Sequence, residues 1–143
     1  MIIEGKCHCG NIAVALEWDS EPPVIPARSC GCTFCLKHGG VWTSNPLARL
    51  AVAIRDASLV SKYAFGSRTA LFHICSRCGA VPFVTSEIAS QLYAVVNVNV
   101  LENIDSSWLR RAPANFDGED VESRLSRRAR NWIANVHIVE VSA

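Results

Sequence analysis

Residues 75–79, Cys75-Ser76-Arg77-Cys78-Gly79, have the form of a zinc knuckle. Two cysteines separated by two residues let the chain wrap around one metal ion. The glycine after the second cysteine permits the tight backbone turn that such a loop needs. Residues 7–10, Cys-His-Cys-Gly, offer a second pair of thiolates at a shorter spacing. Together the pairs predict a closed, structural four-thiolate site, whose metal binding is coupled to folding, with the ligands Cys7, Cys9, Cys75 and Cys78.

A third group of cysteines has no fourth partner. Residues 30–35 read Cys-Gly-Cys-Thr-Phe-Cys, which gives three thiolates. Three protein ligands with one open position are the arrangement of catalytic zinc, and the open position accepts water or a substrate thiolate. The alternative is a second structural site that a histidine closes. The candidates for that fourth ligand are His8, His38, His73 and His137.

The cysteine count argues against a disulfide framework. The chain has seven cysteines, and an odd number cannot pair completely within one chain. Buried free cysteines would not fall into three tight clusters, so metal ligation is the better interpretation. The first six residues lack the pattern of a signal peptide, and a cytoplasmic location, where thiols stay reduced, is expected.

Length and composition describe one globular domain over residues 1–143. Half of the residues are hydrophobic, and charged residues make up 19%. The formal net charge of +1 gives no general attraction to nucleic acid or to an anionic membrane. No apolar run approaches the roughly 20 residues of a membrane span. Membrane association is therefore not expected, and nucleic acid is a disfavoured partner.

Hydrophobic periodicity predicts a mainly β fold with one late helix. Residues 11–18 alternate apolar and polar side chains as a half-buried strand does. Residues 22–26 contain three prolines and are expected to form an extended loop that leads to the second cysteine cluster. The strand at 92–100 carries Asn97 and Asn99 on one face, where they either meet solvent or present amides to a ligand. Further strands are expected at residues 47–54, 59–65, 69–74 and 136–141.

The helix is expected over residues 120–135, where Val121, Leu125, Ala129 and Trp132 recur at helical spacing. Arginines supply much of its polar surface. They either capture the carboxylates of a ligand or form a solvated helix face, partly offset by nearby acidic residues, and we favour the solvated face. This basic group comprises Arg110, Arg111, Arg124, Arg127, Arg128 and Arg130.

The ordered motifs resemble one known family. G-x-C-x-C-G at residues 5–10, C-x-C-x-x-C-x-K-x-x-G at 30–40 and C-x-x-C-G at 75–79 are similar to those of the glutathione-dependent formaldehyde-activating enzymes, a family that includes the centromere protein V domain. The resemblance covers at least residues 3–105. It implies a tent-like β-sheet fold with two zinc ions per chain. It also implies a structural ion on the four-cysteine set and a catalytic ion on Cys30, Cys32 and Cys35.

The activity that the resemblance implies is addition of glutathione to formaldehyde, which gives S-hydroxymethylglutathione. We therefore expect a zinc-dependent carbon–sulfur lyase or synthase acting on a glutathione-type thiol and a small aldehyde. The alternative is a non-catalytic zinc module that binds protein or nucleic acid. Lys37 is a candidate partner for the substrate carboxylate, and His38 a candidate general acid or base. Both a monomer and a homodimer are compatible with the sequence.

Two departures from the family pattern bear on the substrate. Many members have arginine directly after the third cysteine of the second cluster, where this chain has Leu36. Residues 110–143 are expected to be a C-terminal extension specific to a subgroup. Both features are expected to alter the substrate pocket.

Overall fold

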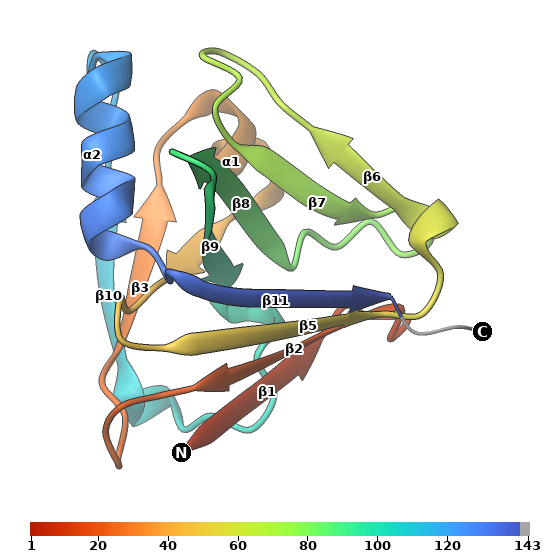
Figure 1. The fold of residues 1–143 in the computed structure, drawn as a ribbon. Coiled ribbons are helices and arrows are strands. Elements are labelled where there is room, and N and C mark those ends of the chain that lie inside the picture. The colour runs from red at the N-terminus through yellow and green to blue at the C-terminus, as the bar shows by residue number, and fades with distance from the viewer. Residues whose placement is uncertain (141–143) are drawn as a thin grey trace.

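The computed structural model describes residues 1–140 and shows two β-sheets, with one long helix beside them (Figure 1). The smaller sheet has the order β1 (Ile2–Lys6), β2 (Ile12–Glu17), β5 (Arg49–Ile54) and β11 (Asn135–Glu140). The larger sheet has the order β10 (Leu109–Ala114), β3 (Ile25–Cys30), β4 (Val41–Thr43), β9 (Gln91–Asn97), β8 (Phe83–Ile88), β7 (Leu71–Cys75) and β6 (Val60–Tyr63). The predicted mainly β fold with one main late helix is confirmed.

The core lies where the smaller sheet meets the larger one. β5 alternates exposed and buried residues along its whole length, as the sequence pattern predicts. Leu16 of β2, Leu50 of β5 and Phe83 of β8 are fully buried members of one hydrophobic cluster. Burying a side chain of this size contributes about 1.5–3 kcal/mol. This shared core fixes the two sheets, and with them the loops at their ends, relative to each other.

Several elements were not predicted. β1, β3, β4, β8 and β10 are strands that the periodicity analysis did not identify. The expected loop at residues 22–26 is wrong at its end, because Pro26 lies in β3 opposite Arg110 of β10. Near the start of a strand, the missing N–H of proline is tolerated. The strand expected at 92–100 ends at Asn97, and residues 98–100 form a 3-10 turn.

The long helix α2 (Val121–Asn131) is shorter than expected. It begins after Asp120, whose side chain accepts a 2.7 Å hydrogen bond from the backbone N–H of Ser123. It ends before residue 135 because the chain at Ile133 pairs with Ala94 and then enters β11. The last residue of the strand expected at 136–141 lies outside the described residues. A short helix, α1 (Thr33–His38), was not predicted.

Residues from 109 onward add to both sheets. β10 pairs with β3, and β11 pairs with β5, and both pairings are parallel. α2 connects these two edge strands and stands along one side of the molecule (Figure 1). Within residues 1–140, no helix has both the length and the apolar character that crossing a membrane requires.

Candidate functional site

The four-cysteine group joins two distant loops. Cys7 and Cys9 follow β1, and Cys75 ends β7 with Cys78 in the turn behind it. The four Sγ atoms lie within 4.8 Å of one another. The Sγ of Cys9 is 3.7 Å from that of Cys7 and 3.5 Å from that of Cys75. A tetrahedral zinc ion with Zn–S bonds of about 2.3 Å places its sulfurs about 3.8 Å apart, so the donor set fits such an ion.

Both turns are shaped for a central ion. Gly10 and Gly79, each directly after a cysteine, have φ angles of +85° and +82°. Only glycine adopts this region without strain, which accounts for both glycines in the motifs. The backbone N–H of Ile12 donates to Cys7 Sγ at 3.3 Å. Without a metal, burial raises the pKa of Cys7 to about 12, so the thiol keeps its proton until an ion displaces it.

The three-cysteine group surrounds the start of α1. Cys30 ends β3, Cys32 is the N-cap of α1, and Cys35 lies within its first turn. Their Sγ atoms also lie within 4.8 Å of one another. Cys32 Sγ accepts a 3.3 Å hydrogen bond from the N–H of Cys35, and Cys35 Sγ accepts one of 3.4 Å from the indole N–H of Trp42. The end of β3 and the start of α1 therefore hold the Sγ atoms of Cys30, Cys32 and Cys35 close together.

Protonation differs sharply within this group. A hydrogen bond from the Cys35 thiol, with a smaller contribution from the charge of Arg127, lowers the pKa of Cys30 to about 5. The same hydrogen bond, with burial, raises the pKa of Cys35. The lowered pKa favours the thiolate form at Cys30, which is the form that binds a metal.

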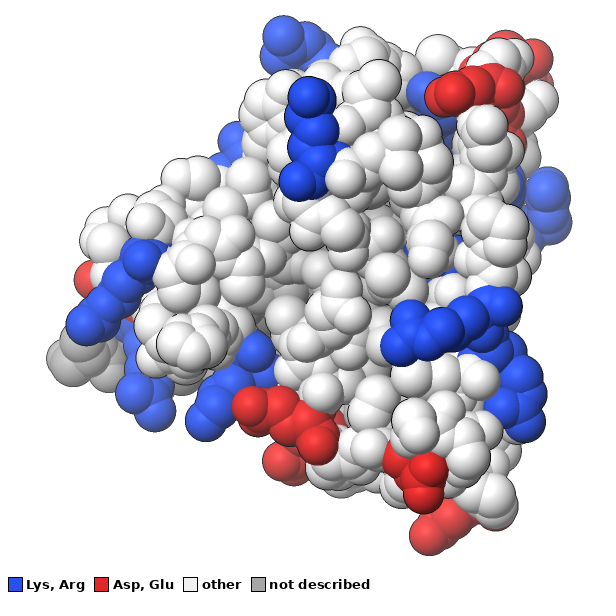
Figure 2. Space-filling model, turned by 180° about the vertical axis from the view of Figure 1, so that it is seen from behind, with Lys and Arg blue, Asp and Glu red and all other residues white. Residues whose placement is uncertain are grey.

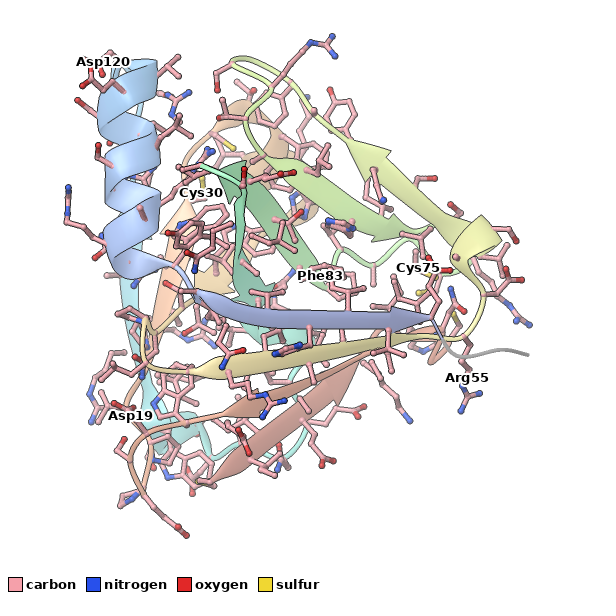
Figure 3. The ribbon with its side chains drawn as sticks, in the orientation of Figure 1. Asp19, Cys30, Arg55, Cys75, Phe83 and Asp120 are labelled. Carbon is pink, nitrogen blue, oxygen red and sulfur yellow. The ribbon has the colours of Figure 1, made fainter. Side chains whose placement is uncertain are left out.

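The two cysteine groups lie in separate parts of the molecule. Figure 3 shows Cys30 on the side that faces α2, and Cys75 at the far end of the sheet. The seven cysteines form no disulfides. The structure therefore contains two groups that could each hold a metal ion, as the motifs predicted.

A cavity of about 540 Å³ opens at the three-cysteine group, whereas in the four-cysteine group only Cys7 lines a cavity, a smaller one of about 390 Å³. All three cysteines of the three-cysteine group line the larger cavity. Five aromatic residues also line it: Trp42, Phe65, Phe72, Phe116 and Trp132. Four guanidinium groups also line it, from Arg28, Arg124, Arg127 and Arg128. The three-cysteine group can therefore be reached by a small molecule with apolar and anionic parts.

The arginines of α2 do not all form the solvated face that we favoured. Arg130 is exposed as expected, but Arg128 is buried and Arg124 and Arg127 are half-buried. The apolar pattern misplaced the inner face, since Val121 is 47% exposed. On the face in Figure 2, Lys and Arg side chains lie in small groups with large uncharged areas between them, and no continuous basic surface is visible.

The histidines do not complete either group. Across the described residues, no histidine is in reach of a cysteine group as a further ligand. His38 packs against the rings of Phe34 and Trp42, with centroid distances of 4.5 and 6.0 Å. It lines a second cavity of about 390 Å³, together with His8. Lys37 is exposed on α1 and is not among the residues that line the larger cavity.

Asn97 and Asn99 serve the scaffold. Asn97 is buried, and its side-chain N–H donates to the carbonyl of Val81 at 3.1 Å. The side chain of Asn99 donates to the carbonyl of Gly39 at 3.1 Å. Asn99 is exposed, so the solvent alternative holds for this residue, whereas the buried Asn97 does not face solvent. The Asn99 contact ties the segment after β9 to the C-terminal end of α1.

Fold and site define a class: a mainly β protein with one closed group of four thiols and one group of three thiols that opens to a cavity. The chain belongs to the glutathione-dependent formaldehyde-activating enzyme family, whose model matches residues 2–114. No curated protein matches it significantly. The crystal structure of a Rhodobacter sphaeroides protein is similar, with a TM-score of 0.56 and 29% identity over 77% of this chain and 97% of that chain.

Proposed function

We propose that this protein is a zinc enzyme that forms or breaks a carbon–sulfur bond between a glutathione-type thiol and a small aldehyde. The observation that carries the proposal is the contrast between the two cysteine groups. Four thiols complete one group, whereas three thiols line a cavity of about 540 Å³ in the other. Closed four-ligand sites are structural, and catalytic sites keep a position open.

The donor sets support zinc. Both groups offer only thiol sulfur, and soft thiolates in a tetrahedral arrangement favour zinc among the common divalent ions. In this proposal Cys7, Cys9, Cys75 and Cys78 hold the structural ion, and Cys30, Cys32 and Cys35 hold the catalytic one. A zinc ion on three thiolates would supply one open position at which a substrate thiol is held deprotonated at neutral pH. Seven unpaired cysteines suit a reducing compartment, so we also propose the cytoplasm.

The reaction is the addition of R–SH to H₂C=O, which gives R–S–CH₂OH, and its reverse. The sulfur donates an electron pair to the carbonyl carbon, so the C–S bond forms as the C=O π bond breaks. The proton lost by the thiol ends on the carbonyl oxygen. The cavity supports this chemistry because its aromatic walls limit the water that would compete for the carbonyl.

Charge around the cavity also suits a thiolate. Three thiolates bring more negative charge than a divalent ion cancels, and a substrate thiolate adds to the excess. Arg127 is close enough to Cys30 to lower the pKa of that thiol. We assign part of the compensation of this excess to Arg127, whose guanidinium is also paired with Glu119 at 3.0 Å. We assign no part in the reaction to Lys37 or His38, because neither lines the cavity at the three-cysteine group.

The experiment compares cleavage of a panel of thiol–aldehyde adducts by wild type and Cys32→Ser, followed by NMR. Spontaneous cleavage is measured without protein. The matched control is Ser29→Ala, an exposed residue next to Cys30. We expect faster cleavage with wild type and the control, and the spontaneous rate with Cys32→Ser. Equal cleavage rates for wild type and Cys32→Ser on every adduct would contradict the proposed enzymatic activity and would favour a non-catalytic zinc module.

A further inference from the structure

Arg128 is a buried cation on the cavity wall. Its exposed fraction is 9%, and it lies on the inner face of α2. One terminal nitrogen donates to the hydroxyls of Thr69 at 2.8 Å and Ser86 at 3.2 Å. Its Nε atom is buried and has no hydrogen-bond partner among the described residues. The guanidinium also lies 5.0 Å above the ring of Trp132, which restricts where it can move.

The positive charge of Arg128 has no carboxylate partner. Across residues 1–140, the ion pairs are those of Glu119 with Arg124 at 3.5 Å and with Arg127 at 3.0 Å. Arg28, on the same cavity wall, is bound only to the hydroxyl of Ser44 at 3.1 Å. The wall therefore carries two guanidiniums, Arg28 and Arg128, that no carboxylate of residues 1–140 contacts in an ion pair.

Holding Arg128 charged at this place costs free energy. Burial, together with the neighbouring charges of Arg127 and Arg124, lowers its pKa to about 10, although the charge of Glu119 acts in the opposite direction. Buried charges in proteins are normally paired, because an isolated one loses its hydration. An anion in the cavity would restore that balance.

The thiolates of the three-cysteine group are not that anion. Across the described residues, the hydrogen bonds of the Arg128 side chain go to Thr69 and Ser86, and none goes to a thiol of the three-cysteine group. The counter-ion of Arg128 has to arrive with a ligand.

We propose that Arg128, aided by Arg28, binds a carboxylate of the thiol substrate, and that α2 is the element that selects an acidic thiol. This rests on the proposed function of the same cavity and adds the substrate's charge to it. α2 lies beyond residues 2–114, which the family model matches. The selectivity thus depends on Arg128 of the C-terminal extension, and Arg28 of the zinc-binding core assists it. A neutral thiol of equal size gains nothing from the two guanidiniums.

The test measures the dissociation constants of three probes with the zinc-loaded protein by calorimetry. The probes are glutathione, its diethyl ester, which lacks both carboxylates, and S-methylglutathione, which lacks the free thiol. We expect wild type to bind glutathione about 10- to 100-fold more tightly than the diester, the range for hydrogen bonds to a charged group. Arg128→Gln should reduce that preference to less than about threefold, and Arg128→Lys should retain part of it.

Arg130→Gln is the matched control, because Arg130 lies on the same helix but is exposed and does not line the cavity. It should behave as wild type. Equal binding of glutathione and diester by wild type would overturn the inference, even if Arg128→Gln did not fold. Equal binding of glutathione and S-methylglutathione would instead contradict the proposed function and leave the carboxylate site standing.

Discussion

Cys9 Sγ and Cys75 Sγ lie 3.5 Å apart, although 66 positions separate these residues in the chain. A metal between them closes a loop through most of the larger sheet. Cys9→Ser should therefore unfold or precipitate the protein, because structural zinc binding is worth about 10–16 kcal/mol and a domain's whole stability is about 5–15 kcal/mol. Thermal melting and soluble yield measure this. Ser76→Ala, in the same turn as Cys75, is the control, and a Cys9→Ser protein that melts like this control would refute the structural assignment.

The three-cysteine group should be separable from folding. Cys32 is the N-cap of α1, and serine is a better N-cap than most residues, so Cys32→Ser keeps the helix start while it removes a metal ligand. We expect one zinc ion fewer per chain by elemental analysis, with an unchanged circular dichroism spectrum. Two zinc ions in the variant would mean that the ligands are assigned wrongly.

Trp42 should tune the second metal through its hydrogen bond to Cys35. Trp42→Phe removes the donor 3.4 Å from Cys35 Sγ but keeps an aromatic ring in the core. Loss of such an outer partner costs about 10- to 100-fold in metal affinity. Competition with a chromophoric chelator measures the change. Trp108→Phe, at a residue that does not line the cavity at the three-cysteine group, should leave the affinity of that group as in wild type. Equal affinities in all three proteins would exclude a role for this hydrogen bond.

Phe83 should be a large contributor to stability. Its side chain is fully buried, and its ring stacks on His73 with a centroid distance of 4.1 Å. Phe83→Ala should lower the free energy of unfolding by about 3–5 kcal/mol in urea denaturation. Leu47→Ala, at a residue that is 76% exposed, should change it by less than about 0.5 kcal/mol. Similar losses in both variants would show that the core lies elsewhere.

The metal-binding motifs carried most of what the sequence could predict. Ligand spacing is local, so residues 7–10, 30–35 and 75–79 indicated both groups before any fold was known. Strand β5 was visible because one of its faces is buried and the other exposed. β8 was missed because its first four residues are all buried, which removes the alternation. α1 was missed because six residues are too short for helical periodicity.

The cavity wall was harder to predict for a physical reason. Helical patterns assume that apolar residues face inward, but α2 directs Arg128 inward and leaves Val121 exposed. No pattern in the sequence distinguishes a buried arginine such as Arg128 from an arginine on a solvated helix face. The hydroxyls that hold it, on Thr69 and Ser86, come from segments 59 and 42 residues away. Such contacts appear only once the chain is folded.

The most direct test of the account is whether a thiol enters the coordination sphere of the metal at Cys30, Cys32 and Cys35. Cobalt replaces zinc in the protein, and glutathione is added while the thiolate-to-cobalt charge-transfer absorption is recorded. We predict that this absorption grows and saturates, and that it does not change in Cys32→Ser. An unchanged wild-type spectrum at saturating glutathione would contradict the open site and the proposed enzyme with it.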